Sequence, residues 1–447
     1  MSETEVKKYP IDRLTNPVKE FIHQGKSGGI VLAISVIAAL IWANSAWAHQ
    51  YFEILEYKLG FHFNGENYFN LDLLHWINDG LMAVFFFVVG LELKREFVGG
   101  ELKNPRKAML PIVAAIGGML VPAAIYFLFN SSGEVQHGWG IPMATDIAFA
   151  LALLYALGDK VPLSLKVFLT ALAIVDDLGA VLVIAFFYST DISMLNLLIG
   201  LAFALTMYIG SRAGVRSVVF YAILGIGGLW TAFLMSGVHA TIAAVIAAFM
   251  IPADVQIKEA AYVKRVRRYL DEFLKIDPKD EIPNLTEEQL LIVEGIKEDT
   301  DRAIPPLQRL EFALHPFVTF IVLPIFALAN AGVALDFDME TLFSTNVALG
   351  VGFGLLVGKV IGVMGATLLM IKLKLAPPLD GMTNRNLFGI GLLAGIGFTM
   401  SLFVTSLAFS HEEYTMQAKV GIFAASILAA VLGYLVLNSA PQKSDKA

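Results

Sequence analysis

Long apolar stretches separated by polar connections run through the whole chain. A helix rises about 1.5 Å per residue, so about 20 apolar residues cross a hydrocarbon core about 30 Å thick. The pattern therefore predicts an all-α polytopic membrane protein with twelve transmembrane helices. These predicted spans cover residues 29–47, 74–93, 109–129, 138–157, 163–188, 194–211, 217–234, 237–252, 316–335, 347–371, 387–409 and 416–438.

The distribution of basic residues agrees with this division of the chain. Connections on the cytoplasmic side of a membrane protein carry an excess of Lys and Arg. With the N-terminus placed inside, 29 of the 32 Lys and Arg residues fall in segments on the inner side. The outer segments hold only Lys58 and Lys419, and Lys359 lies within a span. The alternation predicts that both termini are cytoplasmic.

The first outer connection, at about 56–71, differs from an ordinary short loop. It has two β-prone runs around Asn64-Gly65, and this dipeptide is a strong hairpin signal. An isolated two-stranded hairpin is only marginally stable, so we expect it to pair with a second copy of the chain. A loop without this role is the alternative.

The inner connection 253–309 is unusually long and charged. Its apolar positions predict helices near 257–276 and 286–300. We interpret it as a small helical insertion that is a solvated appendage without a separate function, and a regulatory or partner-binding role is the alternative. The predicted organisation is an N-terminal cytoplasmic segment 1–28, transmembrane helices 1–8 in 29–252, the insertion 253–309, transmembrane helices 9–12 in 310–438, and a cytoplasmic tail 439–447.

Composition supports the membrane class and excludes some chemistry. Of the 447 residues, 57% are hydrophobic and 16% are charged, whereas soluble domains carry about 25% charged residues. The chain has no cysteine, which excludes disulfides, thiolate catalysis and cysteine metal sites.

Two adjacent carboxylates mark the candidate site. Asp176 and Asp177 lie at the midpoint of the span 163–188. A carboxylate at the bilayer centre costs at least about 2.5–3.5 kcal/mol, and two neighbours repel each other. Because helix formation requires neither residue, we interpret the pair as an ion or proton site. Successive helix residues point about 100° apart, so we place Asp177 on the ion path and Asp176 against Lys359.

Two further polar positions lie deep in predicted spans. Asp146 follows Pro142, which removes a helix hydrogen bond, and with Thr145 it predicts an interrupted helix. A proline-kinked helix with a locally satisfied Asp is the alternative. Lys359 lies at the midpoint of the tenth span, too deep to reach either interface easily. It needs a carboxylate partner, for which the three aspartates are candidates, and a purely structural salt bridge is the alternative.

Gly395 and Gly397 lie at the centre of the eleventh span. Paired glycines either break a helix or allow close packing. The fourth span is the middle of spans three to five and the eleventh is the middle of spans ten to twelve, and these triplets begin on opposite sides. Interrupted spans at matching places in two halves predict inverted repeats with a site at the membrane midplane.

Several sequence strings carry a close resemblance to a known family. They are LHWINDGLMAVFFFVVGLELKRE, IPMATDIAFAL, ALAIVDDLGA, SGVHAT, LEFALHPFV, PIFALANAGV, LLVGK and GIGFTMSLF. From about residue 28 to 437, outside the insertion, the chain resembles the NhaA family of bacterial sodium/proton antiporters. The resemblance implies the NhaA fold, with helices 4 and 11 interrupted and crossing. It also implies a homodimer joined through the first-loop hairpin, in the inner (cytoplasmic) membrane.

The resemblance also implies roles for single residues. Asp177 and Asp176 would carry the protons and bind the transported sodium, the only metal expected. Thr145, Asp146, Lys359, Gly395 and Gly397 would form the helix breaks and support the site. A cytoplasmic cluster would respond to pH, although charges that cap spans and set topology are the alternative; it comprises Glu92, Lys94, Arg95, Glu96, Glu311, His239 and His315. Asp79 matches a further polar position in the membrane, and Phe312 departs from the family pattern, where a histidine is expected.

The resemblance implies an electrogenic, pH-regulated antiporter that expels sodium, and lithium, in exchange for entering protons by alternating access. A protonated carboxylate attracts sodium weakly, so the two ions compete for one site. A sodium-coupled symporter of an organic anion on a similar fold is the alternative, but three Asp and one Lys at the midplane favour a small cation. A central Lys disfavours a passive channel, and the chain lacks the G-x-G-D pattern of intramembrane aspartyl proteases. We expect no enzyme activity, no cofactor and no nucleic-acid partner; membrane lipid and a second copy are the expected partners.

Overall fold

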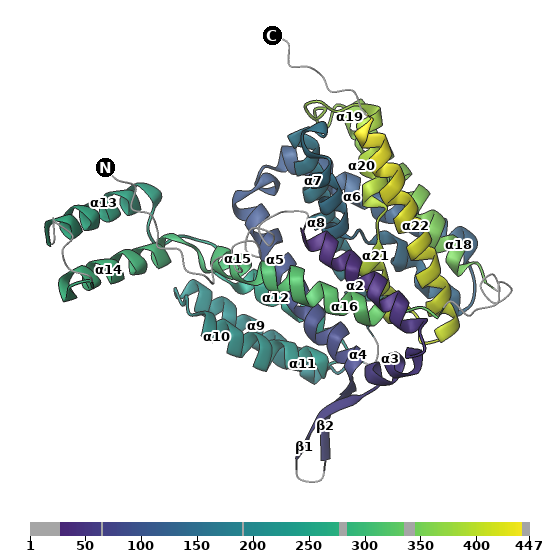
Figure 1. Cartoon of the computed structure of the whole chain (residues 1–447), viewed down its shortest axis with the longest axis horizontal. Coiled ribbons are helices and arrows are strands. Elements are labelled where there is room, and N and C mark those ends of the chain that lie inside the picture. The colour runs from purple at the N-terminus through teal and green to yellow at the C-terminus, as the bar shows by residue number, and fades with distance from the viewer. Residues whose placement is uncertain (1–26, 64–65, 190–191, 277–283, 335–344, 440–447) are drawn as a thin grey trace.

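The computed structural model describes residues 27–63, 66–189, 192–276, 284–334 and 345–439. Most of these residues form helices gathered in one body, from which a β-hairpin and a pair of helices project (Figure 1). The predictions for the N-terminal segment before residue 27, for the Asn64-Gly65 turn and for the tail after residue 439 lie outside the described residues.

Within the described part of the chain, eight helices are long and apolar enough to cross a membrane, and two bent helix pairs pass the same test. The eight are Leu73–Gly99 (α4, η1 and α5), Pro105–Phe129 (α6), Glu134–Ala156 (η3 and α7), Leu163–Phe187 (α8), Met194–Arg212 (α9), Pro306–Asn330 (α15, η6 and α16), Val347–Lys372 (α18, η7 and α19) and Glu412–Asn438 (α22). The pairs are Ser27–Ala43 with Ala48–Leu55 (α2 and α3) and Asn384–Ala394 with Phe398–Ala408 (α20 and α21). Val218–Leu234 (α10, η5 and α11) and Ala240–Met250 (α12) are shorter apolar helices.

The first predicted span, 29–47, was wrong at its end. Helix α2 stops at Ala43, and the chain bends by 114° into α3. The Asn44 side chain donates hydrogen bonds of 2.8 Å to the carbonyl groups of Leu40 and Val333. Because Leu40 lies in α2, the first bond satisfies a carbonyl that a continuing helix would have used, and the tertiary contact turns the chain aside.

The ninth predicted span, 316–335, was also wrong at its start. The helix begins at Pro306, because a proline at the first helical positions has no N–H that needs a partner. Two prolines, Pro305 and Pro306, therefore give the helix a defined start well before the apolar stretch.

Small residues allow the helices of the body to approach closely. A Cβ at Gly362 of α19 would collide with the backbone of Gly117 in α6, so these two helices touch through their main chains. Helices α5 and α12 meet in the same way, because Gly90 packs against Ala248. Small residues at helix contacts are typical of membrane proteins, in which the hydrophobic effect does not drive helices together.

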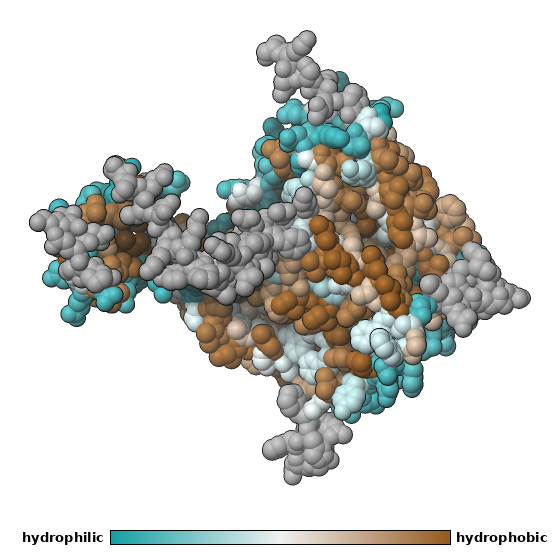
Figure 2. All heavy atoms as spheres, viewed as in Figure 1, coloured by the Kyte–Doolittle hydropathy of each residue, from teal (hydrophilic) through white to brown (hydrophobic). Residues whose placement is uncertain are grey.

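The outer surface of the body is apolar. Figure 2 shows hydrophobic atoms over the helical body, with hydrophilic atoms gathered at its ends and on the projecting helix pair. Large side chains such as Ile34, Ile41 and Leu120 are more than half exposed. Water would disfavour so much exposed apolar area, whereas lipid accepts it. The chain is therefore a multi-pass membrane protein.

The hairpin predicted at about 56–71 is present. Strand β1 (Lys58–Phe63) pairs antiparallel with β2 (Glu66–Asp72), with a register shift between Leu59 and Phe61. The projecting helices are α13 (Glu259–Ile276) and α14 (Glu287–Ala303), in the part of the insertion where the apolar spacing predicts helices.

Candidate functional site

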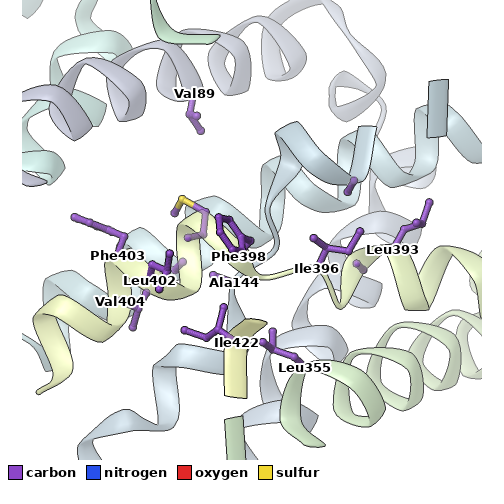
Figure 3. Packing of buried hydrophobic residues seen from close by; sticks show 14 of the residues in the cluster. Val89, Ala144, Leu355, Leu393, Ile396, Phe398, Leu402, Phe403, Val404 and Ile422 are labelled. Carbon is purple, nitrogen blue, oxygen red and sulfur yellow. The ribbon is translucent and has the colours of Figure 1, made fainter. Parts of the chain in front are cut away.

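Two interrupted helices meet in the middle of the body. Residues 144–146 separate the 3₁₀ helix η3 (Glu134–Met143) from α7 (Ile147–Ala156), and residues 395–397 separate α20 from α21. The Asp146 N–H donates to the Ile396 carbonyl at 2.6 Å, and the Thr145 hydroxyl donates to the Ala394 carbonyl at 2.8 Å. Figure 3 shows Ala144 next to the non-helical segment that carries Ile396. The two breaks therefore satisfy each other's exposed backbone groups.

Asp146 lies at the starts of two helices. One carboxylate oxygen accepts a hydrogen bond from the Phe149 N–H of α7 at 3.0 Å. The other accepts from the Thr399 N–H of α21 at 2.9 Å and from the Thr399 hydroxyl at 2.5 Å. Each helix start carries about half a positive elementary charge, so the buried carboxylate offsets both.

The glycines of the second break lie where a side chain would collide. A Cβ at Gly395 would stand 2.6 Å from the Leu355 carbonyl oxygen. A Cβ at Gly397 would stand 2.7 Å from a Leu355 methyl group and 3.1 Å from the Ala144 carbonyl oxygen. Their role is close approach of the break to η7 and to the first break.

Helix α8 carries the adjacent carboxylates without interruption. Asp176 and Asp177 are both fully buried, and so is Lys359. The Lys359 ammonium group donates to the Asp176 carboxylate at 2.5 Å. The pairing joins α8 to α19 in the interior of the protein, where either charge alone would be costly.

The position of Lys359 depends on close helix packing. Lys359 is the first residue of α19 and follows the π-helix η7 (Gly354–Gly358). The stem of the lysine passes Gly118 of α6, because a Cβ at Gly118 would lie 3.8 Å from its Cδ. A larger residue at Gly118 would narrow the path of the lysine toward α8.

Asp177 has a different environment from Asp176. Neither of its carboxylate oxygens accepts a hydrogen bond from the described residues, although both are buried. On α8, Thr170 and Ile174 line a cavity of about 800 Å³ that also contacts the ends of α5 and α7. Residues at positions i, i+4 and i+7 share a helix face, so Asp177 lies on the same face of α8 as Thr170 and Ile174. Asp177 itself is fully buried and is not among the residues that line the cavity.

Three residues of the expected pH-responsive cluster are in contact. Arg95 of α5 pairs with Glu311 of α15, and also with Glu96 at 3.1 Å. Glu92 lies within electrostatic reach of all three. Lys94 donates instead to the carbonyl groups of Phe249, at 2.7 Å, and of Ile251. Lys94 therefore satisfies the end of α12.

The two histidines and Asp79 are placed differently. His315 is exposed on α15 and lies within electrostatic reach of Arg95. His239 precedes α12, and its Nε2 lies 3.0 Å from the carbonyl oxygen of Tyr188, at the far end of α8 from the cavity. Asp79 in the π-helix η1 (Trp76–Leu81) lies within electrostatic reach of His239. The structure thus separates His239 from the cluster around Arg95 and Glu311.

Sequence reasoning missed two features. One is Thr399, whose backbone and hydroxyl groups both bind Asp146. Its position two residues after Gly397, in the first turn of α21, was the available signal. The other is a buried pair, Asn78 and Asn330, in which the Asn330 amide donates to the Asn78 side-chain oxygen at 2.8 Å and joins η1 to α16.

Broken helices that meet beside buried carboxylates and a buried lysine, inside a bundle with an apolar outer surface, define a polytopic membrane protein of the secondary-transporter class. The chain belongs to the Na+/H+ antiporter 1 family, whose model matches residues 19–437.

Curated relatives cover nearly the whole chain. The Na(+)/H(+) antiporter NhaA of Oleidesulfovibrio alaskensis is 46% identical over 429 residues, which cover 96% of this chain and 95% of that protein. The Na(+)/H(+) antiporter NhaA 2 of Syntrophotalea carbinolica is 47% identical over 432 residues, which cover 96% and 97% of the two chains. The NhaA antiporter of Wolinella succinogenes is 46% identical over 423 residues, with 94% and 92% covered. These relatives are named as antiporters, which are transporters.

Proposed function

We propose that the protein is an electrogenic Na+/H+ antiporter that expels sodium, and lithium, in exchange for entering protons. The observation that carries the proposal is the contrast between Asp176 and Asp177. Asp176 is paired with Lys359, whereas the buried oxygens of Asp177 have no donor among the described residues. A buried carboxylate without a partner is suited to a hard cation or a proton.

Competition for one carboxylate site explains exchange. Protonation removes the negative charge that attracts sodium, so the site holds protons or sodium, but not both. The Thr145 hydroxyl and the carbonyl groups at the helix breaks supply further oxygen ligands. Lys359 compensates the charge of Asp176 while that carboxylate is deprotonated. Asp177 and Asp176 each take up one proton as sodium leaves, and Lys359 keeps its own, so more than one proton enters for each sodium expelled and the exchange is electrogenic.

The proposed fold has twelve transmembrane helices in two inverted repeats. Eight long helices, two bent pairs and two shorter apolar helices support this number. The mutual hydrogen bonds between the segments 144–146 and 394–397 support a crossing of helices 4 and 11. Access alternates when the bundle that carries this crossing rocks against the remaining helices.

Regulation by pH is assigned to the inner ends of α5 and α15. The Arg95–Glu311 pair joins these helices beside Glu96, and Glu96 also lines the cavity that Thr170 and Ile174 of α8 line. Protonation of either glutamate weakens its attraction to Arg95 and changes how the helices meet. Glu92 and His315 lie close enough to modify this balance. Lys94 binds the inner end of α12, and His239 acts at the opposite end of that helix.

The proposed location is the bacterial inner membrane, with both termini and the insertion 253–309 in the cytoplasm. Two copies associate through the β1–β2 hairpin on the outer side. The transported ions are substrates, and the protein uses no cofactor. Export of sodium would support salt tolerance.

The test uses everted membrane vesicles from cells that lack other antiporters. Respiration acidifies the lumen, and a pH-sensitive dye follows alkalinisation after sodium, lithium or potassium is added. We expect a sodium response that Asp177→Asn abolishes and that the exposed control Asp159→Asn retains. If the protein is present in the membrane and gives no response at any pH, the antiporter proposal fails, and sodium-coupled uptake of an organic anion becomes the better explanation.

A further inference from the structure

The helix pair that projects from the body uses one face of each helix for internal contacts. The Tyr262 hydroxyl lies 2.9 Å from the Thr300 hydroxyl, and Arg265 forms an ion pair of 2.7 Å with Asp299. The ring of Tyr269 packs over Gly295. As the residue number rises along α13, the number of its contact residue on α14 falls, so the two helices are antiparallel.

A second face of α13 is apolar and exposed. Val263, Leu270 and Leu274 follow the spacing i, i+7 and i+11, which places them on one side of a helix. The side chains of Leu270 and Leu274 are 50% and 68% exposed. The side of α13 that contains Tyr262 and Tyr269 contacts α14, and Val263, Leu270 and Leu274 lie outside this contact.

The matching face of α14 lies beside it. Leu290 is 48% exposed and Val293 is 40% exposed, at positions i and i+3. Successive helix residues are rotated by about 100° about the helix axis. Measured from the direction that faces the other helix, Val263, Leu270 and Leu274 lie at about 90–130° around α13, and Leu290 and Val293 lie at about 90–150° around α14. Because the helices are antiparallel, both displacements lead to the same side of the pair. The five side chains Val263, Leu270, Leu274, Leu290 and Val293 therefore form one exposed apolar face.

The edges of this apolar face differ in net charge. On the free edge of α13, Lys264 and Arg267 adjoin it, with Asp271 between them. Lys297 lies between Leu290 and Val293 around α14, and the residues on the free edge of that helix are acidic: Glu287, Glu294, Glu298 and Asp301. An anionic lipid surface would favour basic residues on both edges. A copy of the same surface, turned by 180°, instead presents an acidic edge to the basic one.

We propose that the apolar face is a contact between two copies of this chain, in which each α13 packs antiparallel on the α14 of the partner. The result is a four-helix bundle with the apolar residues inside and basic edges against acidic edges. A two-fold contact is self-complementary, so one apolar face and two opposite edges suffice. The contact is separate from the β1–β2 hairpin and does not depend on the transport activity.

The absence of cysteine from the chain makes disulfide trapping selective. Two full-length chains with different tags are co-expressed, one with Leu274→Cys and the other with Leu290→Cys, and membranes are oxidised. The contact places Leu274 against Leu290 of the partner subunit, so a disulfide joining the two tags is expected. It should form about tenfold or more faster than with Glu272→Cys, on the opposite side of α13, because the contact raises the effective thiol concentration.

Three further substitutions decide the outcome. Leu270→Glu should abolish the trapped product, and Arg267→Glu should slow its formation until Glu294→Arg in the other chain restores it. Sodium exchange in vesicles should be unchanged in each of these three variants and in the three cysteine variants. The proposal is overturned if trapping is no faster than in the Glu272→Cys control or survives Leu270→Glu. A water-soluble maleimide that reacts with the Leu274→Cys variant tests the other occupants. The proposal is also overturned if no disulfide forms and the maleimide is blocked only in anionic vesicles, which would indicate a lipid surface. The same holds if no disulfide forms and the maleimide is blocked only before purification, which would indicate another protein.

Discussion

Asp146 and Thr399 connect the starts of two helices that are 253 positions apart in the sequence. The Thr399 N–H and hydroxyl both donate to one oxygen of Asp146, at 2.9 and 2.5 Å. The second oxygen binds the first turn of α7 through Phe149. The two helix starts thus donate hydrogen bonds to both oxygens of a buried carboxylate that forms no ion pair with a lysine or arginine among the described residues.

Removing the hydroxyl group of Thr399 tests this arrangement. We expect Thr399→Val to lower the stability of the protein by about 1.5–3 kcal/mol, because the bond is made to a charged group. Sodium exchange should fall as the two breaks lose their alignment. Thr405→Val, in the same helix, removes an ordinary bond to the Ser401 carbonyl and should cost about 0.5–1.5 kcal/mol. Thermal unfolding in detergent measures both, and equal shifts would contradict the special role of Thr399.

Lys359→Met leaves the carboxylate of Asp176 buried without a positive partner. Breaking a buried ion pair in this way costs about 3–5 kcal/mol, so we expect a large drop in the unfolding temperature. The double variant Lys359→Met with Asp176→Asn removes both charges and should recover most of the loss. A double variant as unstable as Lys359→Met would show that packing of the lysine stem, and not the charge of Asp176, is responsible.

The apolar pattern predicted most of the helices because a bilayer requires about 20 consecutive apolar residues. It could not place the end of the first helix, because that end depends on a contact between Asn44 and Val333, 289 positions apart. The start at Pro306 was a local signal, but the apolar stretch was given more weight. The apolar pattern therefore misplaces the end of a helix where a short polar segment adjoins a long apolar one.

For the site, the sequence showed the energetic cost of the buried charges and also predicted one pairing. Buried charges at 176, 177 and 359 are expensive in lipid whatever surrounds them. The 100° between successive helix residues led us to place Asp176 against Lys359, and the structure has this ion pair; the approach of α6, α8 and α19 that allows it is not encoded in any local pattern. Thr399 escaped notice because a threonine in an apolar helix usually bonds to its own backbone. Its role follows only from the position of Asp146 across the break.

The glycines of the second break give a steric test. A methyl group at Gly397 would stand 2.7 Å from Leu355 and 3.1 Å from the Ala144 carbonyl oxygen. We expect Gly397→Ala to cost about 1–3 kcal/mol through overpacking and to reduce sodium exchange. Gly365→Ala in α19 is the matched control, since nothing lies within 4 Å of its added Cβ. Retained stability and exchange in Gly397→Ala would mean that the break does not require the close approach.

Competition between protons and sodium at Asp177 predicts how exchange depends on pH. While the protonated site predominates, each rise of one pH unit increases the free carboxylate about tenfold for each competing proton. The apparent KM for sodium should therefore fall as pH rises and become constant once the site is deprotonated. Glu311→Gln, which alters the Arg95 pair but not the carboxylate site, should change the pH dependence of the maximal rate and leave this KM trend intact. Dye-based exchange assays over a series of sodium concentrations at each pH separate the two effects. A KM that stays constant with pH while the maximal rate changes would contradict direct competition, and would mean that pH acts only through the cluster around Arg95 and Glu311.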